Sequence, residues 1–452
     1  MFRKLLMILL LTLFTVPLAS AALAGGGDGP PKDMLKGVFT QVQPEARTAI
    51  FEKDGTKEIY TLTLAEGMKA EDVRLNKKVL VSLDKHAGEG VIKDISVMFM
   101  DMTITRIVTL LIVGLIGGLL SGFIGSGGAF VLTPAMMSLG VPGAVAVASN
   151  MCHKFPKAMV GAYKRYKYGQ ADIKLGLVMA STAIIGVQVG IVIQKYILNR
   201  FGNAGSNLYV SFVFMVVLVV VGGYVLYDAY KLGKGKSEAK VSKLALWLQG
   251  INLPPMIHFK VAKLTISAWV TIPVGLLTGM LAATIAVGGF IGVPGMIYIV
   301  GASAVVASAT ELIIAFVMGA WGSIQWGLSG LIDIRLTLLI LCGSLIGVQL
   351  GALGTTYVKD YMIKLVMAST MLIVAVSRGV KVPGYLADLD LIPALQHQTV
   401  AILEQVSFWA LVTALGSAAL IITVAMVTGM RQAKLESATQ QARQATQVVS
   451  HG

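Results

Sequence analysis

The heptapeptide "IIGVQVG" (Ile184–Gly190) recurs as "LIGVQLG" (Leu345–Gly351), and the two copies are 161 positions apart. Each copy keeps a Gly-x-Gln-x-Gly core inside an apolar stretch of the kind that membrane helices vary freely. Because glycines four positions apart share one helix face, the motif predicts a close helix contact that the fold makes twice. The glutamine is expected to stand outside that glycine face.

Other segments match at the same offset and extend the repeat. They pair Val113–Leu115 with Val274–Leu276, Gly127–Gly128 with Gly288–Gly289, and Asp172–Leu175 with Asp333–Leu336. The sequence therefore predicts two homologous membrane repeats, residues 105–230 and 267–380.

The relative orientation of the repeats follows from their charges. The first repeat carries the basic stretch "HKFPKAMVGAYKRYKYG", whereas its counterpart "AFVMGAWGSIQWGL" contains no Lys or Arg. Basic loops stay on the cytoplasmic side of a membrane, so the two stretches are expected on opposite sides. This pattern indicates an inverted repeat, the common architecture of secondary transporters.

Composition sets the protein class. The chain has 452 residues, of which 56% are hydrophobic and only 13% charged, with a mean hydropathy of +0.77. These values predict an all-α polytopic membrane protein. The net charge of +14 arises from Lys and Arg between apolar runs, which indicates membrane topology and no nucleic-acid partner. Two cysteines in apolar surroundings give no disulfide or zinc pattern, and no cofactor or metal is expected.

The flanking segments predict an exported N-terminus. Residues 1–24 have the pattern of a signal peptide, with an uncleaved anchor helix as the alternative. Residues 31–100 contain five short β-rich runs and are expected to form a small all-β extracytoplasmic domain, a barrel or a sandwich. The inner (plasma) membrane is the expected location. The remaining predicted segments are a cytoplasmic interfacial linker (231–266), an extracytoplasmic segment (381–405), an additional transmembrane helix (406–430) and a cytoplasmic tail (431–452).

A glycine-rich break occurs in each repeat, "SGFIGSGGAFVLTP" (Ser121–Pro134) and "AATIAVGGFIGVPG" (Ala282–Gly295). A broken helix exposes backbone N–H donors and a positive dipole end, which suit an anion at the repeat interface. Small polar residues follow each break and would complete the coordination of the anion. The alternative is that the glycines allow close packing and the polar residues bond across helices. The predicted substrate-binding residues are Gly125, Ser126, Gly127, Gly128, Ser149, Asn150, Gly288, Gly289, Ser308 and Thr310.

Glu311 aligns with Asn150 and stands among apolar residues. An intramembrane carboxylate is a candidate for proton coupling, and the alternatives are a salt bridge or a position near the membrane surface. His153 and Lys154 are expected at the cytoplasmic edge of the bundle, and the alternative is that they draw anions toward the pore.

At these residues the chain resembles the sulfite exporter TauE/SafE family of membrane permeases, over residues 105–380. The resemblance rests on "GLIGGLLSGFIGSGGAFVLTPAMMSLGVPGAVAVASN", on "YKRYKYGQADIKLG", and on the weaker second copy "GLIDIRLTLLILCGSLIGVQLG". It implies export of sulfite or organosulfur anions, driven by an ion gradient. The family often has three consecutive glycines at the break, where this chain has Gly-Ser-Gly-Gly-Ala and Val-Gly-Gly-Phe.

The leading hypothesis is a secondary transporter of a small sulfur-containing oxyanion or organosulfonate that works by alternating access. Two alternatives stay open: an anion channel, and a membrane receptor whose exported domain binds a ligand. The chain lacks H-E-x-x-H, G-x-S-x-G and a Walker lysine motif, so no enzyme is predicted. The expected partners are a small anionic substrate, the lipid bilayer, and a protein that docks on the exported domain.

Overall fold

The structure of the protein is a computed structural model. The structure describes residues 34–53, 58–65, 68–70, 73, 75, 78–83, 90–97, 99, 101–124, 128–233, 243–354 and 360–450. The signal peptide predicted for residues 1–24 lies outside these ranges.

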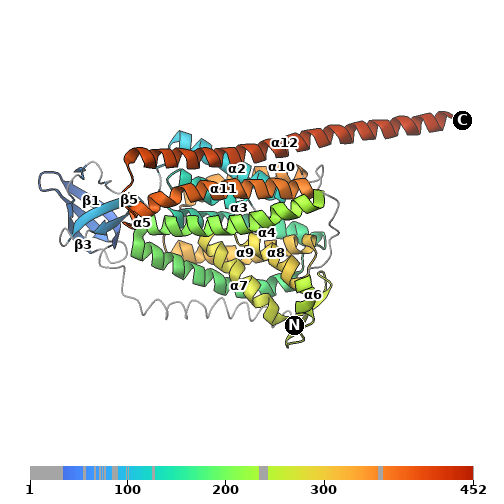
Figure 1. The fold of residues 1–452 in the computed structure, drawn as a ribbon, viewed down its shortest axis with the longest axis horizontal. Helices are drawn as coiled ribbons and strands as arrows, with labels where there is room; N and C mark the ends of the chain where they lie inside the picture. The colour runs from blue at the N-terminus through green and yellow to red at the C-terminus, as the bar shows by residue number, and fades with distance from the viewer. Residues whose placement is uncertain are drawn as a thin grey trace.

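The N-terminal domain is a closed five-stranded barrel in the order β1-β2-β3-β5-β4, at one end of the molecule (Figure 1). Its strands are β1 (Met34–Gln43), β2 (Thr48–Lys53), β3 (Ile59–Leu64), β4 (Lys78–Leu83) and β5 (Val91–Val97). Strands β3 and β5 pair in parallel, and the other ladders are antiparallel. Phe39 and Phe51 meet edge to face in the core, with ring centroids 5.1 Å apart. The predicted small β domain is confirmed as a barrel.

The rest of the chain is a helix bundle. Among the described residues, seven helices are long and apolar enough to cross a membrane, which confirms the polytopic all-α prediction. Gly202, with φ 65°, divides the long α5 into two helices at a kink. The elements are α2 (Ile104–Ile124), α3 (Ala129–Ser138), α4 (Gly143–Lys167), α5 (Ile173–Gly233), α6 (Lys243–Gln249), β6 (Met256–Phe259), β7 (Leu264–Ser267), α7 (Ala268–Ile285), α8 (Gly289–Gly295), η2 (Met296–Val300), α9 (Ala304–Leu328), α10 (Ile334–Gly354), α11 (Asp360–Asp388) and α12 (His397–Ser450).

The repeated glycine motif forms the seams between the repeats. A Cβ atom at Gly347 of α10 would lie 2.0 Å from the carbonyl oxygen of Leu115 in α2. At the equivalent contact, a Cβ at Gly186 of α5 would lie 2.0 Å from the carbonyl oxygen of Leu276 in α7. Only glycine permits such close backbone approach. Each repeat therefore packs its glycine helix on the first helix of the other repeat, and the predicted packing role of the motif is confirmed.

Helices α4 and α9 are equivalent in the two repeats and pack against each other. Gly161 of α4 faces Leu312 of α9, whereas the earlier residue Phe155 faces the later residue Gly319. Because residue numbers run in opposite senses along this contact, the two helices are antiparallel. Equivalent helices that run in opposite directions are what an inverted repeat requires.

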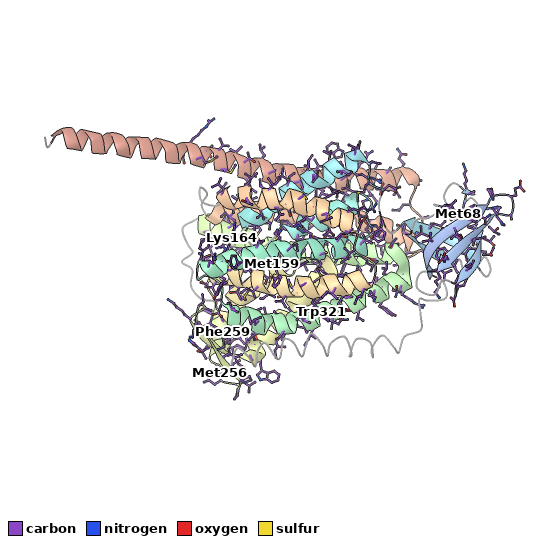
Figure 2. All side chains as sticks on the ribbon, turned by 180° about the vertical axis from the view of Figure 1, so that it is seen from behind. Met68, Met159, Lys164, Met256, Phe259 and Trp321 are labelled. Carbon is purple, nitrogen blue, oxygen red and sulfur yellow. The ribbon has the colours of Figure 1, made fainter. Side chains whose placement is uncertain are left out.

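The basic stretch of the first repeat is helical and not a loop as predicted. Helix α4 continues through Pro156 to Lys167, so only its last turns form the basic end of the bundle. Lys164 at this end and Met68 of the barrel domain lie at opposite ends of the molecule (Figure 2). Met256 and Phe259 of the β6–β7 hairpin lie at the Lys164 end.

The last two helices, α11 and α12, are longer than the sequence predicts. Helix α11 continues to Asp388 and α12 begins at His397, so helices take up most of the segment predicted as a connection. Helix α12 continues through the predicted tail to Ser450 and projects well beyond the bundle (Figure 1).

Candidate functional site

Helix α4 places a row of polar side chains inside the bundle. Asn150, His153, Lys154 and Lys157 are spaced three and four residues apart, so they share one helix face. Asn150 and His153 are fully buried, Lys154 is 8% exposed, and Lys157 is partly buried. The prediction that His153 and Lys154 lie at the edge was wrong, because the uninterrupted helix carries them into the interior.

This face reaches the neighbouring pair α2 and α10. The Lys157 Nζ donates a hydrogen bond to Ser121 Oγ of α2 at 3.0 Å. The His153 Nε2 and Ser344 Oγ of α10 are hydrogen-bonded at 2.7 Å, and His153 Nδ1 lies 3.3 Å from Asn150 Oδ1. Ser121 is near the end of α2, shortly before the predicted glycine break. Lys157 therefore contacts Ser121, the first residue of the stretch in which the sequence predicts the anion site.

The Asn150 side chain holds the short helix α3. Its amide donates to the carbonyl oxygen of Ala129 at 2.9 Å and to Thr133 Oγ1 at 2.8 Å. Ala129 and Thr133 lie on the first turns of α3, which follow the predicted break directly. Asn150 thus fixes the start of α3 against α4, and both of its amide protons are used within the protein.

Glu311 of α9 is a carboxylate buried inside the bundle. Its side chain is 3% exposed, and neither carboxylate oxygen has a hydrogen-bond partner among the described residues. The charges of Glu311 and Lys154 interact across the α4–α9 contact, but the two groups form no salt bridge within 4.0 Å. A Cβ at Gly292 would lie 2.3 Å from Glu311 Oε2, so the carboxylate rests against the backbone of α8. Burying an unpaired carboxylate is costly, which makes this residue a candidate for function.

Two of the predicted substrate ligands are used in contacts between the repeats. Ser149 Oγ accepts a hydrogen bond from the Asp333 backbone N–H at 3.0 Å, and Thr310 Oγ1 accepts one from Asp172 N–H at 3.0 Å. Ser149 and Thr310 are 161 residues apart, and so are Asp172 and Asp333. The two repeats therefore make the same contact with each other in both directions. Ser308 Oγ donates to the carbonyl oxygen of its own helix at Val305. The contacts of these three residues match the alternative in which small polar side chains form hydrogen bonds within and between helices. Substrate binding by these residues stays a prediction.

The glycines predicted as substrate ligands also take part in helix packing where the structure describes them. A Cβ at Gly128 would lie 1.8 Å from the carbonyl oxygen of Gly117, and one at Gly288 would lie 2.6 Å from that of Thr278. Both glycines are therefore required for close packing against the preceding helix. Gly289 is buried at the start of α8. The predicted ligands Gly125, Ser126 and Gly127 lie outside the described residues.

The candidate site thus consists of two lysines from the first repeat and one carboxylate from the second. In the second repeat, Ala315 and Met318 occupy the positions equivalent to Lys154 and Lys157. The two repeats therefore share a backbone arrangement, but only the first carries these positive charges. The site can attract an anion through the lysines and exchange a proton at Glu311. Among the described residues, no group of three or more His, Cys, Asp or Glu side chains is placed to hold a metal ion.

Comparison with known proteins places this bundle among membrane transporters. The family model described as "Sulfite exporter TauE/SafE" matches residues 110–378, which is more than half of the chain and includes the whole candidate site. The chain is 23% identical over 253 residues to "Probable membrane transporter protein YdhB" of Bacillus subtilis (strain 168), covering 55% of this chain and 89% of that protein. No solved structure matches the chain.

Proposed function

Because the chain belongs to the sulfite exporter TauE/SafE family, we propose that this multi-pass membrane transporter exports sulfite or another small sulfur-containing anion. The observation that carries the proposal is the placement of Lys154 and Lys157 inside the bundle, with Lys154 near a buried Glu311 whose carboxylate has no hydrogen-bond partner among the described residues. Buried charges are costly unless they are paired, and a bound anion supplies the missing charge for the lysines.

The lysine donors suit an oxyanion. An ammonium group has three N–H donors, and Lys157 uses one of them on Ser121. Lys154 has no hydrogen bond among the described residues. The remaining donors can bind oxygens of a sulfite or sulfonate group as short, charge-assisted hydrogen bonds. Organosulfonates share this head group, so the proposal covers both classes of substrate.

Glu311 is proposed to couple transport to protons. A protonated Glu311 is neutral and leaves the lysines free to hold the anion, whereas an ionised Glu311 competes for Lys154. Loss of the proton on one side of the membrane then weakens anion binding on that side. Because the protonated state binds the anion more tightly, proton and anion move in the same direction, and a proton gradient drives export when the proton concentration is higher on the cytoplasmic side.

The seams suggest which parts move in alternating access. The tight glycine contacts join α2 to α10 and α5 to α7, so each joined pair takes one helix from each repeat. Helices α4 and α9, which carry the lysines and the carboxylate, lie against each other across the pseudo-symmetry. We propose that the two glycine-joined pairs move as rigid units about the α4–α9 contact and open the site to each side in turn.

The same proposal assigns the ends of the molecule. The basic end with Lys164 and the β6–β7 hairpin is placed in the cytoplasm, following the positive-inside bias. The barrel is then extracytoplasmic, on the outer side of the inner membrane. It is proposed to be an accessory domain on which a partner protein docks.

The test is transport by the purified chain in proteoliposomes. Radiolabelled sulfite flux is measured with and without a pH gradient, and unlabelled thiosulfate, sulfoacetate and sulfate are tested as competitors. Saturable sulfite flux that accelerates with the pH gradient and supports counterflow is expected. Flux without counterflow would favour a channel, and no flux of any of these anions would contradict the proposal.

A further inference from the structure

Arg378 of α11 is a buried cation that the candidate site does not use. Its side chain is fully buried, at 0% exposure. Its Nη2 donates to Ser138 Oγ at the end of α3 and to Ser407 Oγ of α12 at 3.2 Å, with Ser377 Oγ at 3.4 Å. All of these acceptors are neutral hydroxyls from three different helices.

The rest of the guanidinium lacks a hydrogen-bond partner in the part of the chain that the structure describes. Nε and Nη1 are buried and have no hydrogen-bond partner among the described residues, so three N–H donors are left over. No described carboxylate lies within salt-bridge distance of Arg378. The titratable side chain whose charge interacts with it is Tyr385, and a tyrosine is neutral near pH 7.

An arginine in this position cannot escape the cost of burial by losing its proton. Its guanidinium stays charged at all physiological pH values, unlike a lysine or a glutamate. An uncompensated buried charge with unpaired donors is strongly unfavourable. A small anion beside Nε and Nη1 would satisfy both the charge and the donors. We therefore propose that Arg378 holds a small anion, either chloride or the transported oxyanion, in a second site distinct from the lysine site.

The two sites lie at opposite ends of α3. Asn150, next to the lysines, binds the first turns of this helix, and Arg378 contacts its last residue, Ser138. A ten-residue helix is about 15 Å long, so the sites are separated by roughly that distance. The rival explanation is that Arg378 only compensates the negative dipole end of α3. Its donors, however, reach the Ser138 hydroxyl and leave the backbone carbonyls of the last turn untouched.

The test measures anion binding by the purified full chain in detergent, so it does not depend on transport activity. The melting temperature is followed as chloride or sulfite replaces gluconate at constant ionic strength, in a Lys154→Met/Lys157→Met background that removes both lysines of the other site. A saturable rise is expected, and Arg378→Met should abolish it. Arg200→Gln, which changes an exposed arginine of α5, is the matched control and should keep it. A chloride response marks a site for halide, and a response to sulfite alone marks a site for the substrate.

A second measurement covers the case in which Arg378→Met does not fold. Crystals of the wild-type chain grown with bromide should show an anomalous peak within hydrogen-bond distance of Arg378 Nε or Nη1. A well-defined Arg378 without such a peak, or an anion response that survives Arg378→Met, would overturn the second site. Neither result would bear on sulfite flux, so failure of this proposal is distinguishable from failure of the transporter proposal.

Discussion

The seam between α2 and α10 can be tested with a single methyl group. In Gly347→Ala, the new Cβ would lie 2.0 Å from the Leu115 carbonyl oxygen, whereas ordinary contacts begin near 3.4 Å. The helices must therefore separate by about 1.4 Å, the difference between these two distances. Overpacking of this kind costs about 1–3 kcal/mol. Backbone atoms of a packed helix cannot swing away as a flexible side chain does, so we expect the upper part of this range.

The matched control is Gly223→Ala on α5, where a Cβ would meet nothing within 4 Å. Replacing an open helical glycine by alanine stabilises a helix by about 0.5–1 kcal/mol, so the two variants should change stability in opposite directions. The assay is reversible unfolding in mixed micelles with increasing sodium dodecyl sulfate, followed by tryptophan fluorescence. Equal stability of the two variants would refute the close helix contact and with it the structural role of the repeated motif.

Five further substitutions test other parts of the structure. Glu311→Gln should leave anion counterflow intact and remove its acceleration by a pH gradient, and retained acceleration would exclude Glu311 as the coupling residue. Gly292→Ala should displace the same carboxylate, because its Cβ would lie 2.3 Å from Oε2, and should lower pH-driven flux without loss of the folded protein in size-exclusion chromatography. Asp172→Ala should destabilise the chain by about 1–3 kcal/mol in thermal unfolding, because the carboxylate accepts two backbone N–H groups of the β6–β7 hairpin and one of α5. Lys164→Cys should react with an impermeant thiol reagent from the cytoplasm and Leu328→Cys from the outside, and reaction from one side only would contradict the antiparallel α4–α9 pair.

Much of the bundle could be predicted from sequence because the duplication leaves a periodic signal. The offset of 161 residues identified the helix pairs, and the motif around Gly186 and Gly347 proved to form their contact. Close packing requires glycine at fixed positions, so its pattern survives while the apolar residues around it change. The barrel was also predictable, because short alternating runs with turn residues are typical of strands.

The lysine site was not predictable in the same way. Lys157 stands in a basic stretch that contains Pro156, and such a stretch is typical of a cytoplasmic loop. The helical spacing of Asn150, His153 and Lys157 was the available signal for a buried face. Near the end of α9, Trp326 is fully buried, whereas Leu328 is 81% exposed and therefore suits a labelling experiment.

Arg378 gave no signal in the sequence, because it follows an apolar run where arginines usually mark a membrane edge. Its burial results from α12, which packs Ser407 against α11. Ser377 Oγ donates to the Ser407 carbonyl oxygen at 2.7 Å, and Ser407 Oγ donates to the Ser377 carbonyl oxygen at 2.8 Å. A tertiary contact of this kind cannot be derived from local sequence patterns.

Lys154 and Lys157 are proposed to bind the transported anion within the bundle. The most direct measurement compares sulfite counterflow by the wild-type chain, Lys157→Met, and Lys195→Met, which removes an exposed lysine of α5. Lys157→Met should raise the half-saturating sulfite concentration at least tenfold, because a charge-assisted hydrogen bond contributes about 1.5–3 kcal/mol. Lys195→Met should behave as wild type. Unchanged half-saturation in a folded Lys157→Met protein would contradict anion binding by the lysines.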